Sequence, residues 1–251
     1  MAEEDHRWMM ETGTLSDFTI VCQGEKIRVH KVVLAMYSKY FEAMFHNYYK
    51  ESKDGVVEFE DVRPDLMRHL LDYFYKGTTE WKVPKSDLLL HVELWILADR
   101  FEAKTAMLTI EKRTMAELKP FKNKTRVTGE GVLDLVVTHP TCEESAMSCI
   151  ISEAAYVVLL DPKRQASAGK VKDAISRHHT LAELMAFWSA QYVASSSHQG
   201  TISLSAKGEN VRDDVIAQHF TKLLPPKRLA KDDSMPGARY FTPSLFLSNR
   251  H

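Results

Sequence analysis

The most constraining feature of the sequence is a change of hydrophobic period at His30. Residues 17–30 alternate apolar and polar side chains on both sides of Gln23 and Gly24, as strands with one buried face do. Because glycine readily adopts a positive φ, this pair predicts the two-residue turn of a β-hairpin. After His30, apolar residues recur every three or four positions, which predicts helix, and Ser38 predicts a break between two short helices. The chain therefore passes from a hairpin directly into a helical pair.

The helical pair carries a stripe of large apolar side chains that we expect to form core. At this spacing an aromatic stripe is more typical of core packing than of a ligand pocket. His30, at the corner before the stripe, is interpreted as a structural group that hydrogen-bonds the backbone, not as a catalytic one. The stripe consists of Val33, Met36, Tyr37, Tyr40, Phe41, Met44 and Phe45.

The next segment is predicted to contain a strand and a helix. Residues 47–55 are polar and predict a loop, and residues 57–59 alternate as a third strand. Pro64 favours the start of a helix and Gly77 favours its end, so a helix is predicted between them.

Two more helices are predicted before residue 120. Residues 81–83 predict a short strand, and Ser86 predicts the N-cap of a helix that reaches Phe101. A helix over residues 104–118 is predicted to end before Pro120, because proline lacks the amide that a helix interior needs.

The C-terminal half is predicted to be helical. Residues 141–144 and 180–183 fit the capping box, in which hydroxyl and carboxylate side chains bind the free amides of a helix start. Residues 161–170 are polar, and we expect them to be mobile. The predicted helices cover residues 130–138, 142–160 and 180–194.

The composition loosens toward the end of the chain. Residues 199–251 are predicted to be a largely disordered tail, in which residues 210–224 have the spacing of an amphipathic helix. The basic cluster at residues 225–231 is interpreted as a solvated linker, with a nuclear address as the alternative.

Charge and cysteine content exclude several classes of protein. The 33 Lys and Arg balance 34 Asp and Glu to a net charge of −1, so no overall positive field is available to hold a nucleic acid. Three cysteines are too few and too scattered for a disulfide framework, and the acidic N-terminus has no apolar signal segment. Since no apolar run is long enough to cross a bilayer, we expect an intracellular protein, in the cytoplasm or nucleus, without membrane contact.

Two groups of side chains invite comparison with metal sites. His178 and His179 are adjacent, so on a helix they point in different directions, and we interpret them as part of a solvated helix start. Glu143 fits better as a helix-start charge than as a zinc ligand, because the helix dipole favours carboxylates there. The alternative zinc set consists of His139, Cys142, Glu143 and Cys149.

The sequence lacks the motifs of common enzymes. No glycine-rich dinucleotide loop, Walker motif or nucleophile elbow occurs. We therefore expect no enzymatic activity, and we expect no catalytic residue, metal, cofactor or small-molecule substrate.

A string of spaced motifs over residues 8–118 resembles the BTB/POZ family. Such a string in a fixed order is more specific than any single motif. The stretch LLLHVELWILADRF, with a helical region joined directly to the domain, is most similar to fungal BTB/POZ proteins. The motifs are Ser16-Asp17-Phe-Thr-Ile, Val29-His30-Lys31-x-x-Leu34-Ala35-x-x-Ser38-x-Tyr40-Phe41-x-x-Met44-Phe45, Glu51-Ser52, Tyr73-x-Tyr75-x-Gly77 and Leu97-Ala98-Asp99-Arg100-Phe101.

The resemblance implies an α+β fold. A small, mainly antiparallel sheet is flanked by five or more helices and is followed by an all-helical extension and a poorly ordered tail. The implied boundaries are residues 1–118 for a BTB/POZ domain with an N-terminal dimerisation segment, residues 119–198 for the helical extension and residues 199–251 for the tail.

The resemblance also implies a function. It is that of a protein-interaction module that mediates homo- or hetero-dimerisation and recruits partners without catalysis. The implied partners are a second copy, another BTB protein or a cullin scaffold, with no direct contact to nucleic acid. The alternatives are a substrate adaptor of a cullin-based ubiquitin ligase and a transcriptional co-regulator.

Five interaction residues follow from the resemblance. Dimerisation in the family uses a short helix before the first strand, and here that helix offers Trp8, Met9 and Met10. Asp17 and Lys31 correspond to a charged pocket near the dimer surface, and Lys31 stands where well-studied members have arginine.

Two further interaction residues are predicted from the residues themselves. Tyr48 and Tyr49 lie in a polar loop, and tyrosine supplies contact area at little entropic cost. The alternative is that one of the two packs against the core.

Overall fold

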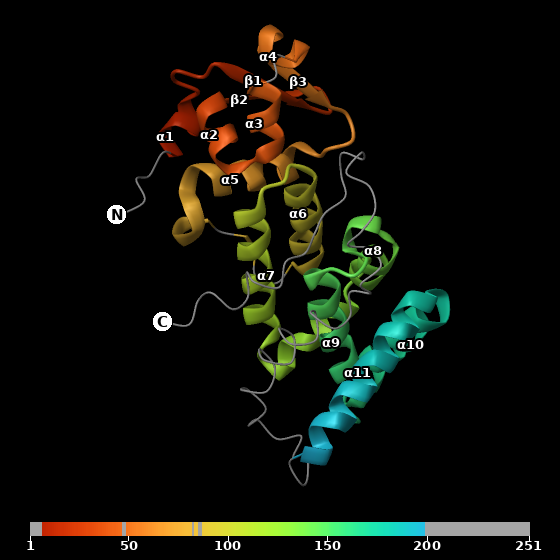
Figure 1. Cartoon of the computed structure of the whole chain (residues 1–251). Coiled ribbons are helices and arrows are strands. Elements are labelled where there is room, and N and C mark those ends of the chain that lie inside the picture. The colour runs from red at the N-terminus through yellow and green to blue at the C-terminus, as the bar shows by residue number, and fades with distance from the viewer. Residues whose placement is uncertain (1–6, 47–48, 82, 85–86, 199–251) are drawn as a thin grey trace.

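The structure runs from a small sheet at one end to a group of packed helices at the other (Figure 1). It is a computed structural model that describes residues 7–46, 49–81, 83–84 and 87–198. The predicted tail at 199–251, with its amphipathic segment 210–224 and basic cluster 225–231, lies outside these residues.

The described elements of the N-terminal part alternate as follows. The strands are β1 (Phe18–Cys22), β2 (Glu25–Val29) and β3 (Val56–Phe59). The helices are α1 (Arg7–Thr12), α2 (Lys31–Tyr37), α3 (Lys39–His46), α4 (Lys50–Asp54), α5 (Pro64–Glu80), α6 (Leu88–Arg100) and α7 (Lys104–Leu118).

The described residues of the C-terminal part form helices joined by short connections. Its α-helices are α8 (Val132–Thr138), α9 (Ala146–Leu160), α10 (Gln165–Arg177) and α11 (His179–His198). Its 3-10 segments are η1 (Phe121–Thr128) and η2 (Pro140–Cys142).

The predicted hairpin forms. β1 and β2 pair antiparallel with Phe18 opposite Val29, and Gln23 and Gly24 link them with φ of 49° and 85°. Positive φ at both central residues is typical of a type I′ turn, whose twist matches that of the paired strands.

The third strand, β3, runs parallel to its neighbour β1, whereas a mainly antiparallel sheet was predicted. The strand order is β2-β1-β3, and β3 pairs parallel with β1, with Val56 opposite Thr19. Because β2 runs antiparallel to β1, it returns the chain to the end of the sheet where β1 begins. The helices between β2 and β3 then carry the chain past β1 to the other edge, where β3 runs in the direction of β1. The described sheet is therefore mixed, with one antiparallel and one parallel pairing.

Ser38 separates α2 from α3 as the sequence predicts. Its hydroxyl oxygen accepts a hydrogen bond from Phe41 N at 3.2 Å, which satisfies a free amide at the start of α3. The same hydroxyl donates to the carbonyl oxygen of Phe101 at 2.6 Å, at the end of α6. This buried side chain thus both caps one helix and joins the helical pair to the central helix.

Three sequence predictions around α4 and α5 need correction. Part of the predicted loop 47–55 is the short helix α4, which ends at Gly55 with a φ of 70°. Gly77 interrupts α5 with a φ of 65°, as expected, but helix resumes as far as Glu80. Trp81 and Val83, the described residues of the predicted strand 81–83, are not in a strand, and both side chains are buried.

The cap of α6 also differs from the prediction. Ser86 lies outside the described residues, and Asp87 caps the helix by accepting a hydrogen bond from Leu90 N at 3.0 Å. The helix over residues 104–118 is confirmed as α7.

The capping boxes predicted in the C-terminal half are wrong. Thr141 lies in η2 and Glu144 has a φ of 53°, so the long helix α9 starts only after Ser145, whose hydroxyl accepts from Ser148 N at 3.1 Å. Thr180 is already inside α11. The hydroxyl-x-x-acid pattern is short, and burial of the residues from 146 onward decides where α9 begins.

The segment predicted to be mobile is largely helix. Most of residues 161–170 belong to α10 or its entry, and α10 buries Ala168, Val171 and Ala174 at a helical spacing of three. Small apolar side chains at that spacing were the signal for helix, and the polar residues between them concealed it.

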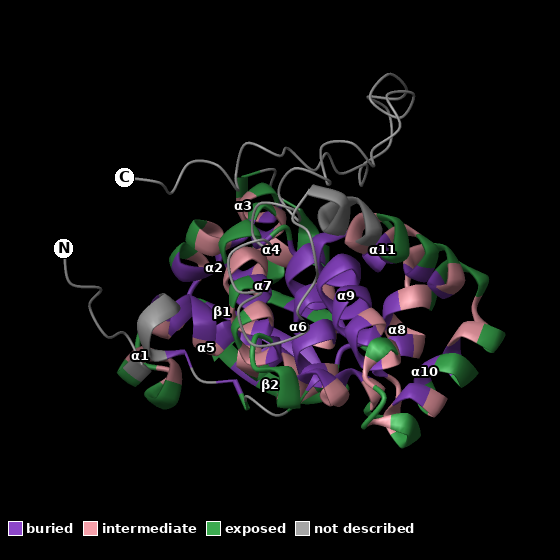
Figure 2. Ribbon diagram, turned by 90° about the horizontal axis from the view of Figure 1, so that it is seen from below, coloured by how far each residue is buried: buried purple, intermediate pink, exposed green. Residues whose placement is uncertain are grey.

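One hydrophobic core extends through the described chain. The buried side chains from Phe18 in β1 to Trp188 in α11 pack together in a single cluster. Figure 2 shows buried residues in the helices at the centre, α6 and α9, and exposed residues toward the outside. In the described residues no helix is both long enough and apolar enough to span a bilayer.

A buried ion pair joins the C-terminal helices. Lys124 in η1 donates to Glu153 in α9 at 3.0 Å, and both side chains are buried. The hydroxyl of Tyr192 in α11 donates to the other oxygen of Glu153 at 2.9 Å. Three segments therefore meet at one carboxylate, which fixes their relative positions.

A second buried acid lies between α6 and α7. Glu111 Oε1 accepts a hydrogen bond from Trp95 Nε1 at 2.8 Å, and Oε2 has no hydrogen-bond partner among the described residues. Burial raises the pKa of Glu111 from 4.5 to about 7, against the smaller effects of the Trp95 bond and of Lys112. The folded protein therefore holds this proton more tightly than the unfolded chain.

This difference predicts a pH dependence of stability. The contribution of protonated Glu111 is complete below the unfolded pKa of 4.5 and is lost as pH rises toward about 7, a loss of about 3 kcal/mol at most. Glu111→Gln does not titrate, so its unfolding free energy relative to the natural protein should rise by up to that amount between pH 4.5 and pH 7.5. Urea denaturation at several pH values measures it.

Glu130→Gln is the matched control, because Glu130 is exposed. Its unfolding free energy should follow that of the natural protein within about 0.5 kcal/mol at every pH. Parallel profiles for Glu111→Gln and the natural protein would show that Glu111 does not hold its proton in the folded state.

Candidate interaction surface

His30 stabilises the corner between β2 and α2. Its Nε2 lies 2.9 Å from the carbonyl oxygen of Thr14, so Nε2 carries the proton and donates it. Its Nδ1 then accepts from the hydroxyl of Tyr75 at 2.7 Å, and the same hydroxyl oxygen accepts from His30 N at 3.0 Å. Burial raises the pKa of Tyr75 to about 12, which keeps the phenol protonated. The geometry is that of a structural group.

Asp17 binds the backbone of the next helix. Its Oδ1 accepts a hydrogen bond from Lys31 N at 2.8 Å, at the first residue of α2. A carboxylate in this place satisfies a free amide and is favoured by the helix dipole. Asp17 and Lys31 are therefore brought together, through the amide of Lys31.

The side chain of Lys31 turns the other way. Its Nζ donates to the carbonyl oxygen of Ser52 in α4 at 2.9 Å. The same Nζ lies 5.6 Å from the ring centroids of Phe18 and Phe45, within the range of a cation–π interaction. Lys31 thus links β1, α3 and α4 inside the domain.

Large apolar side chains are exposed on α1, on α2 and in the turn before β1. Val32 and Met36 are 64% and 72% exposed and, four residues apart, share one face of α2. Trp8 in α1 is 50% exposed, and Leu15 is 77% exposed. Both helices pack against α5 and lie at the same side of the molecule (Figures 1 and 2). We call Trp8, Leu15, Val32 and Met36 the α1–α2 face.

The α1–α2 face only partly matches the sequence predictions. Helix α1 ends at Gly13, whose N–H donates to Met9 O at 3.0 Å and whose φ is 64°, as expected for a C-terminal cap. Met9 and Met10 are partly buried and pack against the core. Met36, predicted to be core, faces outward because Val33 and Leu34 take the buried side of α2.

Of the two predicted tyrosines, the structure describes only Tyr49. Tyr48 is outside the described residues, and Tyr49 is exposed immediately before α4. Helix α4 stands at the top of Figure 1, apart from α1. The structure therefore does not bring Tyr49 to the α1–α2 face.

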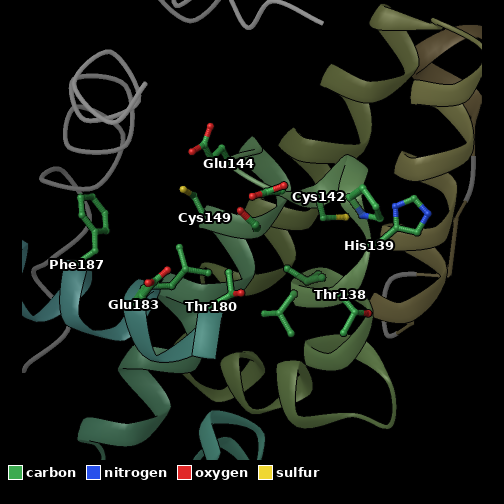
Figure 3. A pocket seen from close by; sticks show the side chains of 14 residues that line it. Thr138, His139, Cys142, Glu144, Cys149, Thr180, Glu183 and Phe187 are labelled. Atoms are coloured by element: carbon green, nitrogen blue, oxygen red, sulfur yellow. The ribbon is translucent and has the colours of Figure 1, made fainter. Parts of the chain in front are cut away.

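The residues considered as zinc ligands line a pocket beside α9 (Figure 3). Burial raises the pKa of both Cys142 and Cys149 to about 12, so the thiols are protonated at neutral pH, whereas zinc binds thiolates. His139 Nδ1 accepts from Thr141 N at 3.3 Å. Within the described residues, no group of three or more His, Cys, Asp or Glu side chains is placed to hold a metal.

The adjacent histidines have separate partners. His178 Nε2 lies 2.7 Å from Asp134 Oδ1, between the end of α10 and α8. His179 Nδ1 lies 3.3 Å from Glu183 Oε1, one turn along α11. The two rings point to different neighbours, as the sequence predicts for consecutive residues.

The family model that matches this chain is that of the BTB/POZ domain, over residues 8–114. Residues 8–114 have the fold of a BTB/POZ domain. The match ends inside α7, so the predicted boundary at residue 118 and the separate extension at 119–198 stay predictions.

Curated relatives match stretches of this chain that are 69 to 103 residues long. Kelch-like protein 40 of Xenopus laevis is 38% identical over 72 residues, which are 29% of this chain and 12% of the relative. The sex determination protein fruitless of Drosophila melanogaster is 35% identical over 69 residues, 28% of this chain and 7% of the relative. Kelch repeat and BTB domain-containing protein 4 of Homo sapiens is 29% identical over 103 residues, which are 38% of this chain and 19% of the relative.

The chain thus spans less than a fifth of the length of these relatives. All three are animal proteins, so they do not support the narrower similarity to fungal BTB/POZ proteins.

Two solved BTB domains are also similar. The BTB domain of zebrafish PATZ1 is 22% identical, covers 43% of this chain and 82% of its own, and has a TM-score of 0.36. The BTB domain of human gigaxonin is 21% identical, covers 44% of this chain and 93% of its own, and has a TM-score of 0.33.

The contacts of Lys31 predict a role in the stability of the BTB/POZ domain. Lys31→Met keeps the apolar stem but removes the hydrogen bond to Ser52 O and the contacts with two aromatic rings. We expect a loss of about 1–2 kcal/mol in the unfolding free energy. Urea denaturation measures it. Lys39→Met, at an exposed lysine paired with Glu42, should cost less than about 0.5 kcal/mol. Equal costs for the two variants would contradict the structural role of Lys31.

Proposed function

We propose that this chain is a non-catalytic protein-interaction module that pairs with a second copy, or with another BTB protein, through the α1–α2 face. A BTB/POZ domain is an interaction module, and the match to its family over residues 8–114 supports this class of function. The observation that carries the choice of surface is the exposure of four large apolar side chains there.

The energetics favour covering the α1–α2 face. Fully burying one large apolar side chain contributes about 1.5–3 kcal/mol, so burial of Val32, Met36, Trp8 and Leu15 is a substantial driving force. Helix α1 has six residues, and a helix that short is unstable without a surface to pack on. A second copy offers the same patch in return, as a two-fold symmetric interface requires.

Asp17, Lys31, Met9 and Met10 have a supporting role in this proposal. Asp17 fixes the start of α2, and Lys31 holds the helices behind it. Met9 and Met10 seat α1 on the core. These four residues shape the α1–α2 face, while Tyr49 marks a separate exposed position for a partner.

The dimer is tested at Met36. We expect the natural chain to sediment as a dimer at micromolar concentration and Met36→Lys to sediment as a monomer, because a buried ammonium without a partner opposes association. Circular dichroism should show unchanged helical content, since the side chain is exposed in the single chain.

Leu160→Lys is the control for this experiment. Leu160 is an exposed apolar residue at the end of α9, outside the α1–α2 face, and its variant should remain dimeric. A natural chain that sediments as a monomer, or a dimer that persists in Met36→Lys, would contradict the proposed surface.

A substrate adaptor of a cullin-based ubiquitin ligase is the second candidate function. The observation that favours it is the helical region packed directly on the BTB/POZ domain, with α8 against α6 and α9 against α7. The resemblance implies that paired helices in this position help adaptors to bind a cullin. A role as transcriptional co-regulator stays a prediction.

The adaptor function predicts direct binding of a cullin. Purified full-length chain should retain a purified cullin N-terminal region in a pull-down at micromolar concentration. Met36→Lys should retain it as well, because the α1–α2 face is assigned to self-association. No retention by either protein would remove the adaptor function and leave the dimerisation module standing.

A further inference from the structure

A pocket of about 480 Å³ lies where α8, η2, α9 and α11 meet (Figure 3). Pockets of roughly 300–1,000 Å³ hold small ligands or the side chains of a bound peptide. Its lining runs from Val136 to Phe187, entirely beyond the residues that match the BTB/POZ family. The proposed dimer surface therefore does not account for it.

One part of the pocket is apolar. Val136 of α8 is buried, and Leu184 and Phe187 of α11 are partly buried against the core. Figure 3 shows Phe187 and Glu183 on the same helix, across the pocket from Cys142 and His139. An aliphatic side chain of a ligand would cover the exposed edges of these groups.

The rim of the pocket is acidic. Glu143 and Glu144 follow η2, Glu183 comes from α11, and all three are exposed. The Nδ1 atom of His179 lies 3.3 Å from Oε1 of Glu183. None of the described residues that line the pocket is a lysine or an arginine. Three carboxylates around an apolar depression select a cationic ligand with an aliphatic anchor.

We propose that the pocket binds the basic segment at residues 225–231 of the same chain. This segment reads Pro-Pro-Lys-Arg-Leu-Ala-Lys and thus places Leu229 between Arg228 and Lys231. Residues 215–231 contain no Asp or Glu. Leu229 occupies the apolar part of the pocket, and the flanking cations lie beside the carboxylates.

The chain is long enough to make this contact. From Glu183 to the end of α11 at His198 the helix rises about 22 Å, at about 1.5 Å per residue. Residues 199–224 connect that end to the segment. Even with the predicted helix over residues 210–224, about 22 Å long at about 1.5 Å per residue, residues 199–209 add up to about 36 Å of extended chain. Because the connecting chain can span this distance, the segment is tethered near the pocket, and a weaker affinity suffices than for a separate peptide.

The test uses the full chain with Leu229 replaced by the photoreactive residue p-benzoylphenylalanine. After irradiation, we expect cross-links within one molecule to peptides that contain residues 136–149 and 180–187, identified by mass spectrometry. Glu143→Lys/Glu144→Lys/Glu183→Lys should lower the yield several-fold, whereas Glu130→Lys, exposed and outside the pocket, should leave it unchanged.

A charge exchange separates binding from misfolding. Lys227→Glu/Arg228→Glu leaves the pocket intact and should lower the yield as much as the triple reversal. Combining the two sets should restore it, because each acid again faces a base. Cross-links to other surfaces, or a yield that neither set changes, would overturn the proposal. Cross-links only between two molecules, increasing with protein concentration, would overturn it too and assign the pocket to the segment of a second copy.

Discussion

Burial of helix α6 around most of its circumference is the constraint on which most of this structure depends. Most of its thirteen residues are buried, and it packs against α5, α7 and α8. A helix that is apolar around most of its circumference is unstable in water, so each of these neighbours covers apolar surface that would otherwise face solvent. The C-terminal helices therefore complete the core of the N-terminal part, and the predicted division at residue 118 falls within continuous packing.

This packing separates two interaction features in space. The α1–α2 face lies beside the sheet at one end, and the pocket between α8, α9 and α11 lies toward the other (Figure 1). Between them, Ser38 ties α2 and α3 to the end of α6, and Glu153 ties three C-terminal segments together. The proposed self-association and the proposed binding of a basic segment thus use different surfaces of one packed unit.

The sequence predicted best where backbone chemistry alone decides the outcome. The turn at Gln23 and Gly24 depends on positive φ, and the break at Ser38 depends on a capping hydroxyl. The end of α7 before Pro120 depends on the amide that proline lacks. The capping boxes at Thr141 and Thr180 failed, because a helix begins where burial of its apolar face begins, which local pattern does not reveal. The parallel pairing of β3 was equally hidden, since it depends on how the helices before it cross the sheet.

The interaction residues show the same limit. Asp17 and Lys31 were predicted as a pair from the sequence. Only the structure shows that Asp17 accepts a hydrogen bond from the backbone amide of Lys31, while the Lys31 ammonium donates to the carbonyl oxygen of Ser52. Met36 was assigned to the core, because a period of three to four does not say on which side of a short helix the core lies. Exposure of the α1–α2 face is a property of tertiary packing.

The buried cysteines have a practical consequence. Burial raises the pKa of Cys22 to about 11 and those of Cys142 and Cys149 to about 12, so alkylation of any of them must wait for local opening of the chain. Cys22 lies in β1, whereas the other two lie beside the pocket. The rates at which these thiols react with one reagent therefore report separately how often the sheet and the C-terminal helices open, without any added label.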